Sequence, residues 1–251
     1  MQARIVPASQ GARWLLDGWN LFRSAPFAWL GLLLGYWLLM TLVSVVPLVG
    51  VVIASIAVPA FSVGFMAAAR AAGRRSGVEL TLLFDGFRHA QRSQLVLGVV
   101  YFICLAVVLG GSSLADGGAL ARWMLTGRRP EEEVLQSEGF FTALVVAALL
   151  YLPVMAAFWF APPLAAWHST GAAKALFFSF AASFMNWRAF LAYGAAAALV
   201  TLVVPFVLAV TLRTLIAGAS FAGRRPVSIQ RASAPPSASE LPPSTTARQM
   251  K

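Results

Sequence analysis

No charged side chain occurs between Arg23 and Arg70. The hydrocarbon core of a bilayer is about 30 Å thick, and a helix needs roughly 20 apolar residues to cross it. This region therefore has room for two crossings. Three further uncharged runs follow, at residues 93–115, 139–173 and 189–212. The pattern predicts an all-α fold, that of a polytopic helical membrane protein.

The composition of the chain supports the same class. Hydrophobic residues make up 59% of the sequence and charged residues only 11%, whereas about a quarter of a soluble domain is charged. The net charge of +10 would suit a nucleic-acid-binding protein. The basic residues, however, are dispersed at the ends of the apolar runs rather than gathered on one face, so we expect no nucleic-acid partner.

The apolar runs divide into individual spans. The first hairpin is expected at 27–46 and 50–69, joined at Val45-Val46-Pro47-Leu48, because proline ends a helix readily. The third and fourth spans are expected near 94–114 and 141–163.

The charges that flank these spans predict an orientation. The segment 115–140 carries a group of acidic residues (Asp116, Glu131, Glu132, Glu133 and Glu138), while the segments 70–93 and 164–188 are basic. Because segments rich in Lys and Arg stay on the cytoplasmic side, we expect a multi-pass protein of the bacterial inner membrane with its N-terminus in the cytoplasm.

The last apolar region allows two interpretations. One span at 189–212 gives five crossings, whereas a hairpin broken at Pro205 gives six and places Arg213 inside the final span, at a cost of about 2.5–3.5 kcal/mol. An internal repeat favours six, because Val203-Val204-Pro205-Phe206-Val207 matches the sequence around Pro47. Five crossings remain the alternative.

Each expected hairpin follows a segment with an amphipathic pattern. These segments are 9–24, 79–92 and 173–187, and their apolar residues recur at the i, i+3, i+4, i+7 spacing of a helix with one apolar stripe. Ser76 and Glu79 have the spacing of a capping box that would start the second segment. We expect three units, each an interfacial helix followed by a transmembrane hairpin.

The C-terminal part of the chain differs in composition from the rest. Residues 224–251 are basic and rich in Pro and Ser, with few large apolar residues. Such a segment cannot bury enough surface to offset its ordering entropy. We therefore expect a helical transmembrane domain at 1–223 and a disordered cytoplasmic tail at 224–251.

The sequence holds no convincing set of catalytic groups. His89 and His168 are far apart, with no cysteine or acid at metal-binding spacing. The segment from Asp116 to Arg122 is similar to the opening of the CDP-alcohol phosphotransferase motif, but its Ala-Arg pair comes one residue late and the later aspartates are missing. We expect a protein that is not an enzyme and needs no cofactor or metal.

Arginines provide the candidate binding residues. Five of them form the candidate contacts to anionic lipids: Arg70, Arg74, Arg75, Arg88 and Arg92. Each could gain roughly 1 kcal/mol from anionic headgroups, although the same residues also serve as ordinary topology determinants. Arg213 is the candidate intramembrane charge; it either acts as a counter-ion or snorkels to the headgroups.

Several short motifs carry a family resemblance. They are Gly18-Trp19-x-x-Phe22, Pro59-x-Phe61-x-x-Gly64, Leu83-Phe84-x-Gly86-Phe87-Arg88, and Ser179-Phe180 with Asn186. With them and the N-terminal residues 1–7, the chain resembles a group of uncharacterised multi-spanning inner-membrane proteins of proteobacteria. More distantly, it is similar to the membrane domain of some glycerophosphodiester phosphodiesterases. The resemblance implies a fold and a location, and no activity.

We therefore expect an integral inner-membrane protein without enzymatic activity, acting as a membrane scaffold or accessory protein. The alternative is a small permease or lipid-handling protein with a site between the repeated hairpins near Arg213. Membrane lipids are its expected partners. The sequence specifies neither a substrate nor a protein partner.

Overall fold

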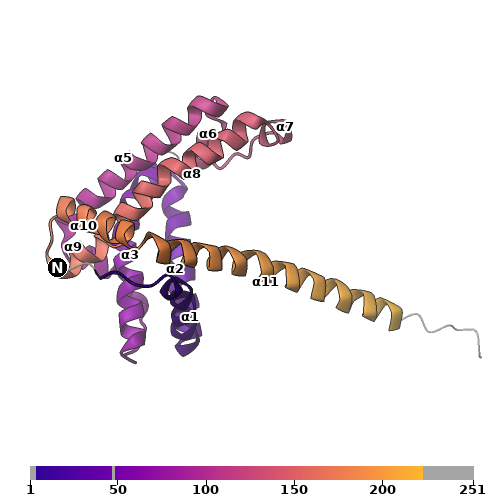
Figure 1. Ribbon diagram of the computed structural model, residues 1–251, viewed down its shortest axis with the longest axis horizontal. Helices are drawn as coiled ribbons and strands as arrows, with labels where there is room; N and C mark the ends of the chain where they lie inside the picture. Colours follow the sequence, from indigo (N-terminus) through magenta and orange to yellow (C-terminus); the bar gives the residue numbers. More distant parts are fainter. Residues whose placement is uncertain (1–3, 47–48, 223–251) are drawn as a thin grey trace, which may run out of the picture. The chain divides into compact units, whose positions relative to one another are not determined.

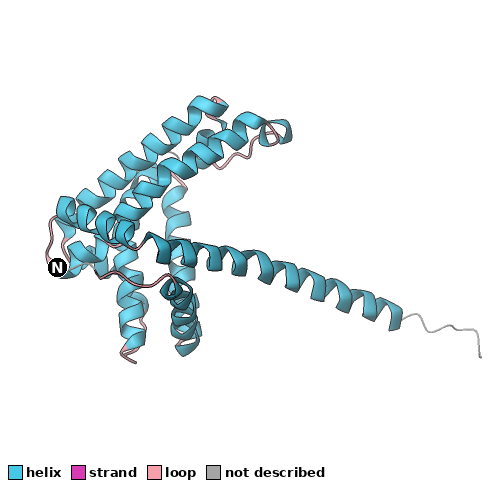
Figure 2. Ribbon diagram, in the orientation of Figure 1, coloured by secondary structure: helices cyan, strands magenta, loops and turns pink. Residues whose placement is uncertain are grey.

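The computed structural model describes residues 4–46 and 49–222, and within them the chain forms helices and no strand (Figure 2). The chain divides into two compact units, Met1–Ala198 and Leu199–Lys251. In the second unit, the described residues belong to a single helix that begins in the first unit. The predicted tail at 224–251 lies outside the described residues.

The helices follow one another with short connections (Figure 1). In chain order they are α1 (Ser9–Ser24), α2 (Pro26–Ser44), α3 (Val49–Gly73), the 3-10 helix η1 (Leu80–Phe84), α4 (Asp85–Arg88), α5 (Gln91–Asp116), α6 (Ala119–Thr126), α7 (Glu132–Leu135), α8 (Glu138–Phe158), α9 (Ala161–His168), α10 (Ala172–Met185) and α11 (Trp187–Ala222).

Five helical segments among the described residues are long and apolar enough to cross a bilayer. They are α2, α3, α5, the pair α8–α9 (Glu138–His168) and the Trp187–Ile216 part of α11. This confirms the predicted class of polytopic helical membrane protein, and the first four segments overlap the predicted spans. Many large apolar side chains on these helices are exposed, as expected of surfaces that face lipid tails.

The predicted hairpin at Pro205 is wrong, because α11 continues through Pro205 without a break. In the first hairpin, Gly50 near the start of α3 lies against the backbone of Val43 in α2. A side chain at position 50 would not fit there. The repeat has Leu208 at the position of Gly50, and a leucine cannot make that approach. The five-span alternative agrees with the structure.

Two of the three predicted amphipathic segments are confirmed as single helices. The first coincides with α1 and the third with α10. The middle segment is not one helix: it forms η1 and α4, and the chain then breaks at Ala90, whose φ of 52° is left-handed. The predicted capping box is also wrong, because the Ser76 hydroxyl donates to the Ala71 carbonyl (3.0 Å) and so closes the end of α3.

Helix α3 lies at the centre of the first unit. It packs against α5 on one side and against η1 and α4 on another. Glycine makes these approaches possible, because a Cβ on Gly98 of α5 would overlap the carbonyl oxygen of Ile56 in α3. Helices α5 and α8 run side by side (Figure 1), and α10 packs against α8 and α9. The C-terminal end of α3 is thereby held close to α9.

Candidate functional site

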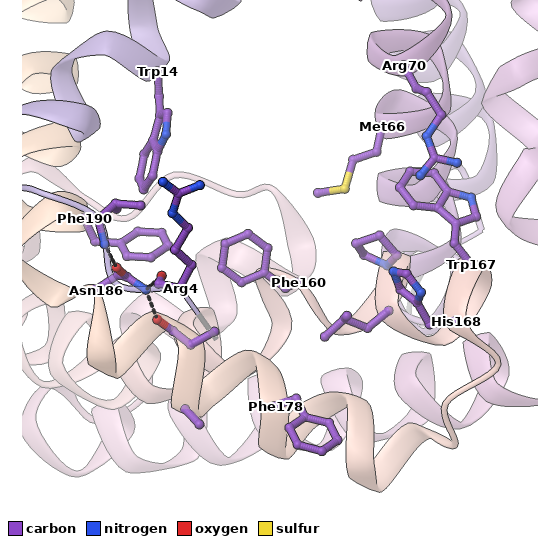
Figure 3. Close-up of a pocket in the computed structure, with 15 residues that line it drawn as sticks. Arg4, Trp14, Met66, Arg70, Phe160, Trp167, His168, Phe178, Asn186 and Phe190 are labelled. Carbon is purple, nitrogen blue, oxygen red and sulfur yellow. Dashed lines mark hydrogen bonds between the residues drawn. The ribbon is translucent and has the colours of Figure 1, made fainter. Parts of the chain in front are cut away.

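A cavity of about 600 Å³ opens within the first unit, between the N-terminal segment, α1, α3, α9, α10 and the first turn of α11 (Figure 3). Most of its wall is aromatic or aliphatic: Trp14, Met66, Phe160, Leu164, Trp167, Phe178 and Phe190. Its charged or titratable lining residues are Arg4, Arg70 and His168, and no carboxylate is among the described residues that line it. The cavity therefore combines a positive rim with an apolar wall.

Arg70 reaches the cavity from the last turn of α3. Its guanidinium carbon lies 3.7 Å from the centroid of the Trp167 ring in α9. Stacking of this kind is a cation–π contact, and it orients the plane of the guanidinium while the N–H groups at its edge stay available. Among the described residues, no salt bridge pairs Arg70 with a carboxylate. Arg70 is thus a fixed, exposed positive charge at the cavity.

Arg4 is placed by a contact to its backbone. The Asn186 side chain, between α10 and α11, donates from Nδ2 to the Arg4 carbonyl (3.2 Å) and accepts at Oδ1 from the Val6 N–H (2.8 Å). These two bonds hold the N-terminal segment against the start of α11. Figure 3 shows Arg4 on the same side of the cavity as Asn186 and Phe190, and Arg70 on the opposite side.

Two buried serines of α10 secure the break between α8 and α9. Ser179 accepts from the Phe160 N–H (2.9 Å) and donates to the Ala156 carbonyl (2.9 Å), and Ser183 donates to the same carbonyl (3.1 Å). Backbone groups released from a helix in a membrane must find such partners, because lipid offers none. The break separates α9 from α8, and α9 carries Trp167, which contacts Arg70.

A cluster of aromatic rings closes the Arg4 side of the cavity. The Phe190 ring centroid lies 5.5 Å from that of Trp14, 5.2 Å from that of Trp159 and 6.1 Å from that of Phe160. These edge-to-face contacts join α1, the α8–α9 break and α11. They also leave an apolar surface at the cavity wall.

A second cavity, of about 320 Å³, lies between α3, α5 and α8. Met66 lines both cavities, so the two adjoin. The wall of the second cavity is mostly apolar, but it contains a pair of tyrosines, Tyr101 and Tyr151, whose hydroxyl oxygens are 3.0 Å apart. This space extends the apolar part of the site toward the middle of the spans.

The structure brings only one of the predicted arginines into the large cavity. That residue is Arg70. Arg74 lines a smaller neighbouring cavity of about 210 Å³, together with Arg70 and Asp85. Arg75, Arg88 and Arg92 line neither of these two cavities. Arg213 is exposed on α11 in the second unit, and it lines none of the cavities described above.

The sequence assigned no site role to Arg4, Trp167 or Asn186, although Asn186 and the N-terminal residues 1–7 belong to the motifs of the family resemblance. The bond between Asn186 and Arg4 joins residues 182 positions apart, so no local spacing reveals it. Trp167 is likewise far from Arg70 in the sequence, so their contact leaves no local signal.

The acidic residue of the phosphotransferase-like segment has a structural role. The two carboxylate oxygens of Asp116 accept from the N–H groups of Gly118 (2.8 Å) and Leu120 (2.7 Å). These bonds satisfy amides at the start of α6, where a helix has free donors. The carboxylate is therefore engaged in capping.

The apolar helices and their exposed apolar faces define an integral, multi-pass membrane protein. A comparison with known sequences indicates which membrane this is. Over 225 residues the chain is 40% identical to a probable inner membrane protein of Burkholderia thailandensis, and the match covers 87% of this chain and 83% of that protein. The chain belongs to the same inner-membrane protein family. No protein-family model matches the chain, and no solved structure matches it.

Proposed function

We propose that this protein is a non-enzymatic accessory protein of the inner membrane that binds an anionic lipid in the cavity between Arg4 and Arg70. The observation that carries the proposal is the cavity itself, in which exposed guanidinium groups face an apolar and aromatic wall. Guanidinium groups pair with phosphate through charge-assisted hydrogen bonds, and apolar walls accept acyl chains. Basic pockets between membrane helices are typical sites for acidic headgroups.

The proposal keeps the lipid-handling alternative but places its site elsewhere. The sequence suggested a site near Arg213, which lies in the second unit. Arg4 and Arg70 lie in the first unit and share one cavity. The distant similarity to the membrane domain of glycerophosphodiester phosphodiesterases stays part of the proposal as a similarity of fold and location, and it carries no argument for lipid binding.

The side chains around the cavity favour binding over catalysis. A hydrolytic or transfer reaction needs a nucleophile or metal site next to a base. His168 is the one general-base candidate among the described lining residues, and no serine, threonine, cysteine or carboxylate accompanies it there. This lining supports the non-enzymatic part of the proposal.

The proposed orientation has the N-terminus and this cavity on the cytoplasmic side. After two crossings the chain returns to its starting side, so Arg70 at the end of α3 would share a side with Arg4. The segment with α6 and α7, which carries acidic residues, would then lie outside, as the distribution of positive charge favours. With five crossings, the C-terminal end of α11 would lie on the side opposite the N-terminus.

The experiment compares lipids retained by purified variants. The full chain is extracted in mild detergent as wild type, Arg70→Gln and Arg88→Gln, and its bound phospholipids are quantified by mass spectrometry. Arg88 is a matched control, because it is a neighbouring basic residue outside the cavity. We expect Arg70→Gln to retain less anionic lipid than wild type, because one of the two cavity arginines remains, and Arg88→Gln to retain as much as wild type.

Two results would overturn the proposal. Equal losses in both variants would mean that positive charge on this side of the protein acts without a defined site. Unchanged retention in Arg70→Gln would remove the cavity as the binding site.

A further inference from the structure

This inference rests on the proposed lipid site and concerns the kind of lipid it holds. We propose that the ligand is a diphosphatidyl lipid, in which two phosphodiester groups are joined by a short bridge, with Arg4 binding one phosphate and Arg70 the other.

The charges in the cavity favour two anionic groups over one. Arg4 and Arg70 both line it, and no carboxylate is among the described residues of its lining. Asp85 lines the smaller neighbouring cavity with Arg70 and forms no salt bridge with it. A lipid with one phosphodiester carries one negative charge and would leave one guanidinium without an anion. Two phosphodiesters match the two arginines.

The placement of the arginines argues against a single shared phosphate. Arg70 is held at one side by its stacking over Trp167. The backbone of Arg4 is held at the opposite side, because its carbonyl is bound to Asn186, and Figure 3 shows the Arg4 side chain on that side. Met66 and Phe160 lie between them in the same view. The two guanidinium groups therefore face the cavity from separate walls and offer two phosphate positions.

The walls select a lipid over a soluble bisphosphate. Between the two arginines the lining is apolar and aromatic, which would leave a small hydrophilic anion poorly solvated. Acyl chains suit that surface, and the adjoining cavity that shares Met66 gives them further room among α3, α5 and α8. A diphosphatidyl lipid and a soluble bisphosphate both carry two phosphates, and the apolar walls of the cavity favour the lipid.

The test measures binding of cardiolipin, the diphosphatidyl probe, against phosphatidylglycerol at equal phosphate. The full chain in nanodiscs of neutral phosphatidylcholine receives either lipid, and binding is followed by the fluorescence of its tryptophans or by native mass spectrometry. The variants are Arg4→Gln, Arg70→Gln, the double variant and the control Arg88→Gln. Arg4 lies before the first helix, so its replacement keeps the test valid even if Arg70→Gln proves unstable.

We expect wild type and Arg88→Gln to bind cardiolipin roughly fivefold more tightly than phosphatidylglycerol, or more. One additional arginine–phosphate contact changes the affinity by about that factor. Arg4→Gln and Arg70→Gln should each bind the two lipids equally, and the double variant should bind neither above the neutral background.

The outcomes separate this inference from the proposed function. If wild type binds both lipids equally and a single replacement weakens both, the lipid site stands and the two-phosphate assignment is wrong. If neither anionic lipid binds above phosphatidylcholine, both proposals fail. If millimolar glycerol bisphosphate displaces bound cardiolipin, the site recognises a soluble anion and the lipid assignment fails.

Discussion

Gly86 of α4 lies against the backbone of Ala60 in α3, so closely that a Cβ on Gly86 would overlap the Ala60 carbonyl oxygen. A second contact of the same kind joins Gly64 of α3 to the backbone of Leu83. The Phe61 and Phe87 rings pack beside these contacts, with centroids 4.8 Å apart. Together they dock η1 and α4 onto the helix that carries Met66 and Arg70 into the cavity.

Replacing Gly86 with alanine should therefore destabilise the protein. The added methyl group has no space beside Ala60, and overpacking of this kind costs about 1–3 kcal/mol. Thermal unfolding in detergent, followed by circular dichroism, measures the effect. Gly18→Ala in α1 is the control, because a Cβ there meets nothing within 4 Å. A Gly86→Ala protein as stable as the control would show that η1 and α4 do not pack closely on α3.

The sequence predicted the spans well, because a bilayer leaves few options for long uncharged runs. It overestimated their number where the motif around Pro47 recurs around Pro205. Gly50 lies against the backbone of Val43, where a side chain would not fit, and the repeat has Leu208 at that position within the continuous helix α11. The break at Ala90 was likewise not foreseeable, since alanine normally favours a helix interior and yet adopts a left-handed conformation there.

The candidate site was only partly predictable, for a different reason. Arg70 stood out because it ends a long uncharged run. Arg4 and Asn186 meet only because the chain folds back so that the first residues reach the start of α11. Trp167 becomes a partner of Arg70 only because α9 packs against α3. Such contacts depend on tertiary packing and leave no periodic signal.

The two serines that bridge the α8–α9 break should differ in their contributions to stability. Ser179→Ala leaves the Phe160 N–H without its partner, and an unsatisfied buried donor costs about 1–3 kcal/mol. Ser183→Ala removes one of two hydroxyl groups that bond the Ala156 carbonyl, so its effect should be smaller. Thermal unfolding of both variants in the same detergent gives the comparison. Equal effects would contradict the special role of Ser179.

The two tyrosines of the second cavity should be energetically coupled. Their hydroxyl groups bond each other between α5 and α8, and hydrogen bonds between membrane helices contribute about 0.6 kcal/mol on average. Tyr101→Phe, Tyr151→Phe and the double replacement form a double-mutant cycle on the free energy of unfolding. We expect a coupling of that order, with the double variant little worse than either single one. Strictly additive losses would mean that the two hydroxyl groups act separately.

The ends of the chain should lie on opposite faces of the membrane. Among the described residues five segments are suited to cross it, and the last of these runs through Pro205 without turning back. An odd number of crossings separates the termini, and the distribution of arginines favours the N-terminus inside. Fluorescent-protein and alkaline-phosphatase fusions at each end report the side, since the first fluoresces in the cytoplasm and the second is active outside it. We expect fluorescence from the N-terminal fusion and phosphatase activity from the C-terminal one. If both ends report the cytoplasm, α11 must turn back in the membrane, as a hairpin at Pro205 would require.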